Sequence, residues 1–160
     1  MVPLLDVFYL SKGMVLNADE RTNRGAFAMD DLISEIPGTT HQAAFAGSKD
    51  VDYFGVSRVR YLEYGTGTRV PALISRPTFP ELYDRPKLMV AEFGGFAYDD
   101  GTWDAAGFLK CNHSVFILMP WHGLSGVKNK SIANQLGERE SQRAGLETMS
   151  AQFDPWYVLA

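Results

Sequence analysis

The stretch Ser114-Val-Phe-Ile-Leu-Met119, closed by Pro120, decides the fold class because it is a nearly continuous apolar run. Its length and its β-branched residues predict a buried strand. Two further stretches predict strands. KLMVAEF at 87–93 ends at two glycines, and VSRVRYLEY at 56–64 interleaves charges with apolar residues, as a strand with one wet face does.

The N-terminal region extends this β-rich pattern. Apolar residues at 2–10 and 14–16 predict two strands, and residues 11–13, Ser-Lys-Gly, predict the turn between them. Asp30 or Asp31 is suited to cap a short helix that runs through residue 36, before the Pro-Gly pair that ends it.

The pattern changes from β-like to helical after residue 128. Residues 131–136 predict one or two helical turns, and Leu146, Met149 and Phe153 recur at helical spacing before Asp154-Pro155 ends the pattern. We therefore expect an α+β fold, a β-rich mixed domain with short helices and a helical segment at the C-terminal end. No linker-like stretch divides the chain, so residues 1–160 predict a single domain.

Composition narrows the class of protein. The chain has 160 residues, of which 46% are apolar and 21% charged, and it has one cysteine, Cys111. One cysteine allows neither an internal disulfide nor a CxxC site, which is typical of a reducing compartment. The N-terminal residues lack the basic start of a secretory signal, and no apolar run approaches the ~18 residues of a membrane span. These features predict a cytoplasmic protein with no membrane partner.

The charges are unevenly distributed along the chain. Residues 1–55 carry 4 basic and 8 acidic groups, residues 56–90 carry 6 and 3, and residues 91–160 carry 5 and 8. Charge alone does not predict a nucleic-acid binder, because the isoelectric point is near 5.3 and such domains usually lie above about 9. The basic segment at 56–90 is the exception in an otherwise acidic chain.

Several catalytic patterns are absent from the sequence. No lysine follows an acidic residue at the (D/E)xK spacing of restriction nucleases, no two prolines are adjacent as in an NPPY methyltransferase loop, and there is no Walker loop, GxGxxG or HExxH. Weaker alternatives are a Ser125 hydrolase, a histidine metal site, and an oxygen-ligand cation site at Asp99, Asp100 and Asp104, for which a polar turn is the simpler interpretation. We therefore expect no catalytic residues and no metal ligands in this chain.

The order of five segments resembles a known family. They read SKGMVLNADERTNRGAFAMDDLIS at 11–34, GSKDVDYFGVSRVRYLEYG at 47–65, RPTFPELYDRPKLMV at 76–90, AYDDGTWDAAGFLKCNHSVFILMPWH at 97–122, and SAQF leading into YVLA at the end. Together they resemble the TaqI-like C-terminal specificity domain, the target recognition domain of N6-adenine DNA methyltransferases and of fused restriction-modification enzymes.

The resemblance implies a domain that recognises double-stranded DNA and performs no chemistry. In that family a separate catalytic domain of the same parent chain binds S-adenosylmethionine and carries the NPPY loop. This chain therefore needs no cofactor of its own, and its apolar last residues fit a fragment of a longer methyltransferase or restriction-modification protein. The alternative is a protein-interaction or ligand-binding module that does not bind DNA.

The side chains that we expect at the DNA are arginine, lysine and asparagine. Arginine can hydrogen-bond to the edge of guanine and asparagine to the edge of adenine, and the cationic arginine and lysine side chains contact phosphates. They are Lys12, Asn17, Arg21, Asn23, Arg24, Arg58, Arg60, Arg69, Arg85, Lys87, Asn112, Lys128 and Lys130. For Arg58 and Arg60, ion pairs with Glu63 or Glu81 are an alternative, and Asn112 could instead satisfy backbone groups. We expect the aromatic residues Tyr53, Phe54, Tyr61 and Tyr64 to lie in the core or on a sheet face.

Overall fold

The structure is a computed structural model that describes residues 4–16, 27–65 and 79–152, with residues 145–152 as backbone only. It confirms the expected β-rich α+β class. Its elements are α1 (Leu4–Val7), β1 (Phe8–Lys12), η1 (Met29–Leu32), β2 (Ile33–Ser34), β3 (His41–Ala46), η2 (Ser48–Asp50), β4 (Val51–Asp52), β5 (Gly55–Val56), β6 (Arg60–Glu63), η3 (Pro80–Leu82), β7 (Lys87–Ala91), β8 (Phe96–Asp99), β9 (Lys110–Cys111), β10 (Val115–Pro120), η4 (Trp121–Leu124) and α3 (Lys130–Gln152).

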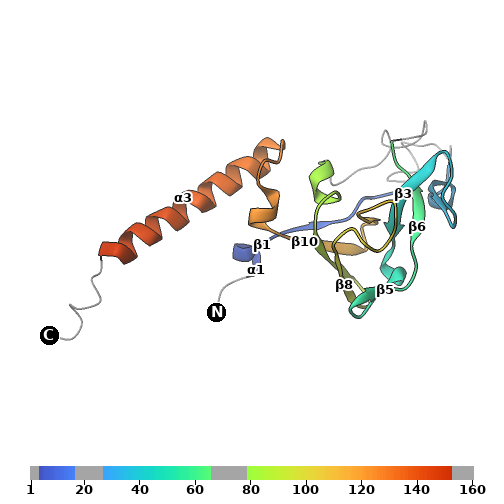
Figure 1. Ribbon diagram of the computed structural model, residues 1–160, viewed down its shortest axis with the longest axis horizontal. Helices are drawn as coiled ribbons and strands as arrows, with labels where there is room; N and C mark the ends of the chain where they lie inside the picture. Colours follow the sequence, from blue (N-terminus) through green and yellow to red (C-terminus); the bar gives the residue numbers. More distant parts are fainter. Residues whose placement is uncertain (1–3, 17–26, 66–78, 153–160) are drawn as a thin grey trace. The chain divides into compact units, whose positions relative to one another are not determined.

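The chain forms two compact units, residues 1–123 and 124–160. The first unit contains all the strands of the described residues, and the second contains α3 (Figure 1). The expectation of one recognition domain over residues 1–160 stays a prediction. No described helix is both long enough and apolar enough to cross a membrane.

One sheet has the strand order β1-β10-β7-β8 and is antiparallel throughout. The stretch at 114–119 forms its central strand, β10, as its apolar sequence predicts. One face of this sheet is core, since Ile117, Met89 and Ala97 lie opposite one another and are fully buried. Because side chains alternate along a strand, the residues next to these three in each strand lie on the opposite face of the sheet.

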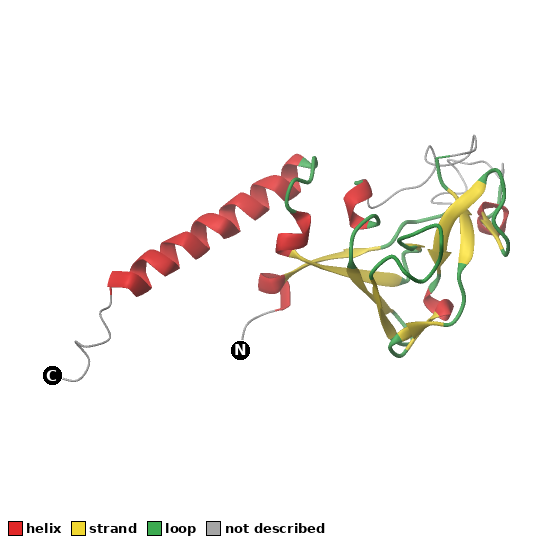
Figure 2. Cartoon of the chain, in the orientation of Figure 1, coloured by secondary structure: helices red, strands yellow, loops and turns green. Residues whose placement is uncertain are grey.

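A second sheet has the order β2-β6-β3-β9, and β4 with β5 forms a separate hairpin (Figure 2). Strands β3 and β6 are antiparallel, whereas β3 and β9 are parallel. The hairpin packs against the start of β8, where Phe54 donates its backbone N–H to the Phe96 carbonyl over 2.7 Å. A Cβ on Gly95 would lie 2.1 Å from the Asp52 carbonyl carbon, so the two turns meet backbone to backbone only because residue 95 is glycine.

Three predicted boundaries are wrong at the N-terminal end. Residues 4–7 are helical rather than extended, and β1 continues through Lys12, which pairs with Phe116, so only Gly13 remains of the predicted turn. At 14–16 isolated bridges form in place of a strand: Met14 pairs with Asn112, and Val15 is also a bridge residue. For β1, pairing with a distant strand, which local sequence does not encode, sets the boundary.

Two helix predictions are also corrected. In place of the predicted helix through residue 36, the structure has the one-turn helix η1. Asp31 caps it by accepting the Ala28 N–H, and the chain then enters β2, which pairs with β6. The predicted turns at 131–136 are part of one continuous 23-residue helix, α3. Asn129 starts it by accepting the N–H groups of Ser131 and Ile132 at 3.1 and 3.3 Å.

Candidate nucleic-acid interface

Gly47 and η2 form a tight turn at the end of β3. Asp50 closes this turn, because its carboxylate accepts the Gly47 N–H over 2.7 Å and its carbonyl accepts the N–H and hydroxyl of Ser57. The carboxylate side chain is only 7% exposed. A buried carboxylate needs a cation or several hydrogen-bond donors beside it, so we expect a cationic side chain next to Asp50.

Arg60 supplies that cation from β6. Its Nη2 lies 2.5 Å from Asp50 Oδ2, and its guanidinium lies 5.5 Å from the centre of the Phe45 ring on the neighbouring strand. The arginine side chain is 21% exposed, so part of it remains open to solvent. The alternative partners Glu63 and Glu81 are therefore wrong for Arg60, because the β3–β6 register places it beside the η2 turn.

Asn112 reaches the same turn from a third segment. Strands β3 and β9 run parallel with Ala46 beside Cys111, so the residues that follow them, Gly47 and Asn112, come together. A Cβ on Gly47 would lie 3.1 Å from Arg60 Nη2, 3.3 Å from Asp50 Oδ2 and 3.9 Å from Asn112 Nδ2. Glycine at this position leaves room for the three polar side chains to converge.

We name Asp50, Arg60 and Asn112 the Gly47 cluster. Two of its atoms, Arg60 Nε and Asn112 Oδ1, are buried and have no hydrogen-bond partner among the described residues. One is a donor and the other an acceptor, and an unmet buried polar atom costs about 1–3 kcal/mol. Both atoms are enclosed, so the part of the cluster that a ligand can reach is the exposed fraction of the Arg60 side chain. The formal charges of Arg60 and Asp50 cancel, which suits a polar ligand edge better than a phosphate.

Arg58 lies just before β6 and behaves differently from Arg60. It pairs with Glu35 at 2.5 Å, and both side chains are more than half exposed, at 56% and 59%. Because Arg58 is outside the strand, the expectation that it points the same way as Arg60 does not apply. Such an exposed pair is worth little, about 0–1 kcal/mol, so a phosphate could compete for this arginine at small cost.

The other predicted DNA contacts are dispersed. Lys12 lies 3.6 Å from Glu92 on the first sheet, and Arg85 donates to the Gly123 carbonyl over 2.6 Å. Lys128 and Lys130 are exposed in the second unit. The remaining predicted residues lie outside the described residues: Asn17, Arg21, Asn23, Arg24 and Arg69.

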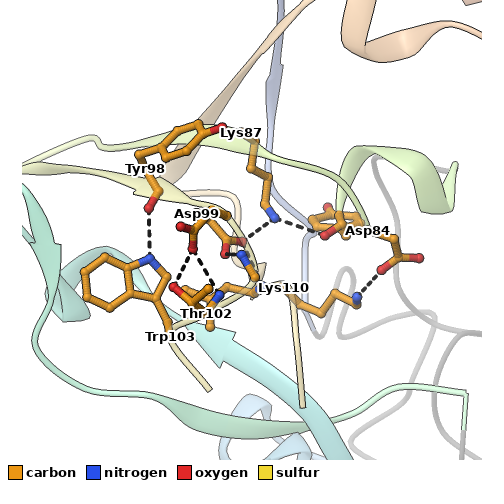
Figure 3. Close-up of polar contacts among 11 residues, drawn as sticks. Asp84, Lys87, Tyr98, Asp99, Thr102, Trp103 and Lys110 are labelled. Atoms are coloured by element: carbon orange, nitrogen blue, oxygen red, sulfur yellow. Dashed lines mark hydrogen bonds and ion pairs between the residues drawn. The ribbon is translucent and has the colours of Figure 1, made fainter. Parts of the chain in front are cut away.

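Lys87 is removed from the predicted DNA contacts because it is fully buried. Its ammonium group lies 2.5 Å from Asp99 Oδ2 and donates to the Tyr83 carbonyl over 3.0 Å (Figure 3). Asp99 also accepts the N–H groups of Gly101 and Leu109, which are the two ends of one surface loop. Burial lowers the pKa of Lys87, and the Asp99 carboxylate opposes that shift. Lys87 therefore has a structural role, because it connects Tyr83 to Asp99 inside the core.

The loop beyond Asp99 uses its other carboxylates locally. Asp100 accepts the N–H and hydroxyl of Thr102, and Asp104 accepts the N–H of Ala106 and the hydroxyl of Tyr61. Among the described residues no group of histidines, cysteines and carboxylates is placed to hold a metal ion. This loop is the polar turn that its sequence suggests.

Two features of the region were not predicted from sequence. Asp50 was not among the candidate residues, although Gly-Ser-Lys-Asp at 47–50 has a polar residue three positions after a turn glycine, a spacing typical of a capped turn. Tyr53 and Phe54 were expected to be buried or on a sheet face, but they are 71% and 80% exposed at the tip of the β4–β5 hairpin. Phe54 there has a φ of 67°, which a bulky residue rarely adopts.

Comparison with known proteins finds no matching family model, and no curated protein matches the sequence.

Proposed function

We propose that this chain is a target recognition domain that binds double-stranded DNA in a sequence-specific manner. The observation that carries the proposal is the meeting of Arg60 and Asn112 at Gly47. Both residues were selected from sequence as base readers, from segments about 50 positions apart, and the Arg60 side chain remains partly exposed there. Arginine and asparagine are the side chains best suited to the major-groove edges of guanine and adenine.

The surroundings of the Gly47 cluster support the same role. Arg58, close by in sequence, is exposed and held only by a surface ion pair, so it can contact a phosphate. Met14 pairs with Asn112, and the segment that carries Asn17, Arg21, Asn23 and Arg24 begins three residues later in the chain.

The resemblance adds a wider setting to this proposal. In it, the chain belongs to an N6-adenine DNA methyltransferase or a fused restriction-modification enzyme that works in the cytoplasm. Catalysis and S-adenosylmethionine binding belong to another domain of the same parent protein, and this chain contributes recognition only. The partners are then the DNA duplex and that catalytic domain.

The proposal is tested by fluorescence anisotropy of the 160-residue chain with a labelled random-sequence duplex at a series of salt concentrations. We expect Arg58→Ala to reduce the slope of log K against log salt by about 0.9, the value for one phosphate contact. Adding Arg60→Ala to this variant should weaken DNA binding further. Arg60→Lys keeps a cation beside the buried Asp50, so a loss of binding in this variant is not due to loss of folding.

Lys49→Ala is the matched control, because Lys49 is exposed but is not among the predicted DNA contacts. It should change the slope less than Arg58→Ala does. An unchanged slope in the Arg58→Ala variant, or no further loss of affinity on adding Arg60→Ala, would contradict the assignment of these residues. Absence of binding to any duplex, with or without the parent protein, would favour the alternative of a module that does not bind DNA.

A further inference from the structure

The outer face of the β1-β10-β7-β8 sheet is apolar, although the opposite face already forms the core. Residues directly opposite one another in an antiparallel sheet share a face, so the register defines two rows across the four strands. One row is Lys12, Phe116, Val90 and Phe96, and the other is Leu10, Leu118, Leu88 and Tyr98. Seven of these eight side chains are apolar or aromatic.

This outer face is partly open to solvent. Tyr98 is 58% exposed and Leu10 is 40% exposed, and of the eight side chains only Leu118 is buried. An antiparallel sheet that faces water normally alternates hydrophobic residues inward with polar residues outward. The departure from that alternation on all four strands indicates a face that another surface covers.

The β4–β5 hairpin extends the outer face beyond the edge strand β8. Phe54 and Tyr53 lie edge-on to the Phe96 ring, with ring centres 4.8 and 6.1 Å away. Near them Trp103 covers part of the strand edge, because its indole N–H donates to the Tyr98 carbonyl over 2.9 Å (Figure 3). The outer face thus continues into a set of exposed aromatic rings.

The margin of the outer face is acidic. Asp52 packs its backbone against Gly95 at the start of β8, Glu92 follows β7, and Asp100 follows β8, and all three are exposed. The one basic side chain in the two rows, Lys12, is held at 3.6 Å by Glu92. A DNA backbone would meet net negative charge here, whereas a basic protein surface would meet complementary charge.

The size of the face selects the kind of occupant. Four strands at about 4.8 Å spacing and two rows about 7 Å apart give a footprint on the order of 300 Å². A stable face-to-face dimer buries roughly 800 Å² per partner, which is well above the footprint of the two rows alone. It matches one α-helix, which is about 10 Å wide and covers about 15 Å in ten residues.

We propose that the outer face docks a single amphipathic helix of a protein partner, with an apolar stripe on the sheet and lysine or arginine along its flanks. This site lies on a different sheet from the Gly47 cluster. Because the interface is small, we expect micromolar or weaker binding. The same chain would then contact nucleic acid through one sheet and protein through the other.

The test uses the 160-residue chain and a designed 16-residue helical peptide that has a leucine stripe and lysine flanks. Amide chemical shifts measured during titration should change at β7, β8 and β10, with 1:1 saturation. Tyr98→Glu and, separately, the milder Leu10→Ser should each weaken binding at least tenfold. A peptide with glutamate in place of every lysine should also bind at least tenfold more weakly.

Gln42→Glu is the matched control, since Gln42 is an exposed position on β3 of the other sheet. This variant should bind the lysine peptide as the unmodified chain does. The proposal is overturned if shifts occur elsewhere, if binding survives both outer-face variants in folded protein, or if the glutamate peptide binds equally well. Sedimentation that detects a dimer abolished by Tyr98→Glu would assign the face to a second copy and would also overturn it.

Discussion

Lys87 and Asp99 form a fully buried ion pair that connects β7, β8 and the loop after β8. Asp99 retains two backbone N–H donors, but these alone do not balance a buried negative charge. Removing the lysine leaves that charge uncompensated, and the usual cost of breaking such a pair is about 3–5 kcal/mol. The pair therefore stabilises the fold strongly only while both members are present.

We predict that Lys87→Met lowers the free energy of unfolding by about 3–5 kcal/mol in urea denaturation, and that adding Asp99→Asn recovers part of the loss. The matched control is the exposed pair of Arg58 and Glu35, where Arg58→Met should cost less than about 1 kcal/mol. Equal losses in the two single variants would show that burial does not set the strength of these pairs.

Cys111 makes the free energy of unfolding depend on pH in the alkaline range. Burial raises the pKa of its thiol from 9.0 to about 12. Between these values the unfolded chain loses the thiol proton while the folded chain keeps it, so the thiol stabilises the fold below pH 9 and that contribution falls as the pH rises to 12. Burial raises the pKa of the Tyr83 hydroxyl as well, and it lowers that of Lys87, which acts in the opposite direction.

Comparison with Cys111→Ala isolates the thiol from the other titrating groups. We predict that the free energy of unfolding falls more steeply from pH 9 to 12 in the unmodified chain than in the variant, by up to about 1.4 kcal/mol per pH unit. The measurement is urea denaturation at fixed pH steps across this range. Parallel curves for the two proteins would mean that the thiol titrates alike in the folded and unfolded states.

The contact between the β4–β5 hairpin and the turn before β8 depends on Gly95. A Cβ at this position would lie 2.1 Å from the Asp52 carbonyl carbon and 2.3 Å from the Tyr53 nitrogen, and backbone cannot yield as a flexible side chain can. We predict that Gly95→Ala costs about 2 kcal/mol or more and exposes Phe96. Gly38→Ala is the control, because a Cβ there meets nothing within 4 Å; thermal unfolding that moves both variants equally would contradict the prediction.

Strands with a strong apolar pattern could be predicted from sequence, and elements that depend on a distant partner could not. The strands predicted at 114–119 and 87–93 overlap β10 and β7 because a run of apolar side chains favours a strand without reference to its partner, and the buried Lys87 is the exception in β7. The turn predicted at 11–13 is instead mostly strand, because β10 offers partners as far as Phe116. Residues 33–34 likewise leave a short helix to pair with β6.

The candidate site shows the same limit. Residue type was enough to select Arg60 and Asn112, but only the parallel pairing of β3 with β9 brings them to one turn. Residue type was misleading for Lys87. No residue near it in sequence indicates that its ammonium group pairs with the carboxylate of Asp99, twelve positions later, inside the core. Charge in a basic segment therefore does not indicate exposure.

At the scale of the whole molecule, the two four-stranded sheets of the first unit present different chemistry. The β2-β6-β3-β9 sheet carries the Gly47 cluster, with arginine and asparagine at one turn. The β1-β10-β7-β8 sheet carries an apolar outer face with an acidic margin. Under the two proposals above, the β2-β6-β3-β9 sheet reads DNA and the β1-β10-β7-β8 sheet binds a protein partner.

In the proposed function, the chain selects DNA by sequence through Arg60 and Asn112. The most direct measurement is repeated selection of randomised 20-base-pair duplexes by the 160-residue chain, followed by sequencing. We predict one enriched motif, whose preference is relaxed at one base pair by Asn112→Ala and at another by Arg60→Lys, each by about 1–3 kcal/mol of discrimination. Recovery of no motif, or of the same motif with unchanged preferences in both variants, would contradict the account.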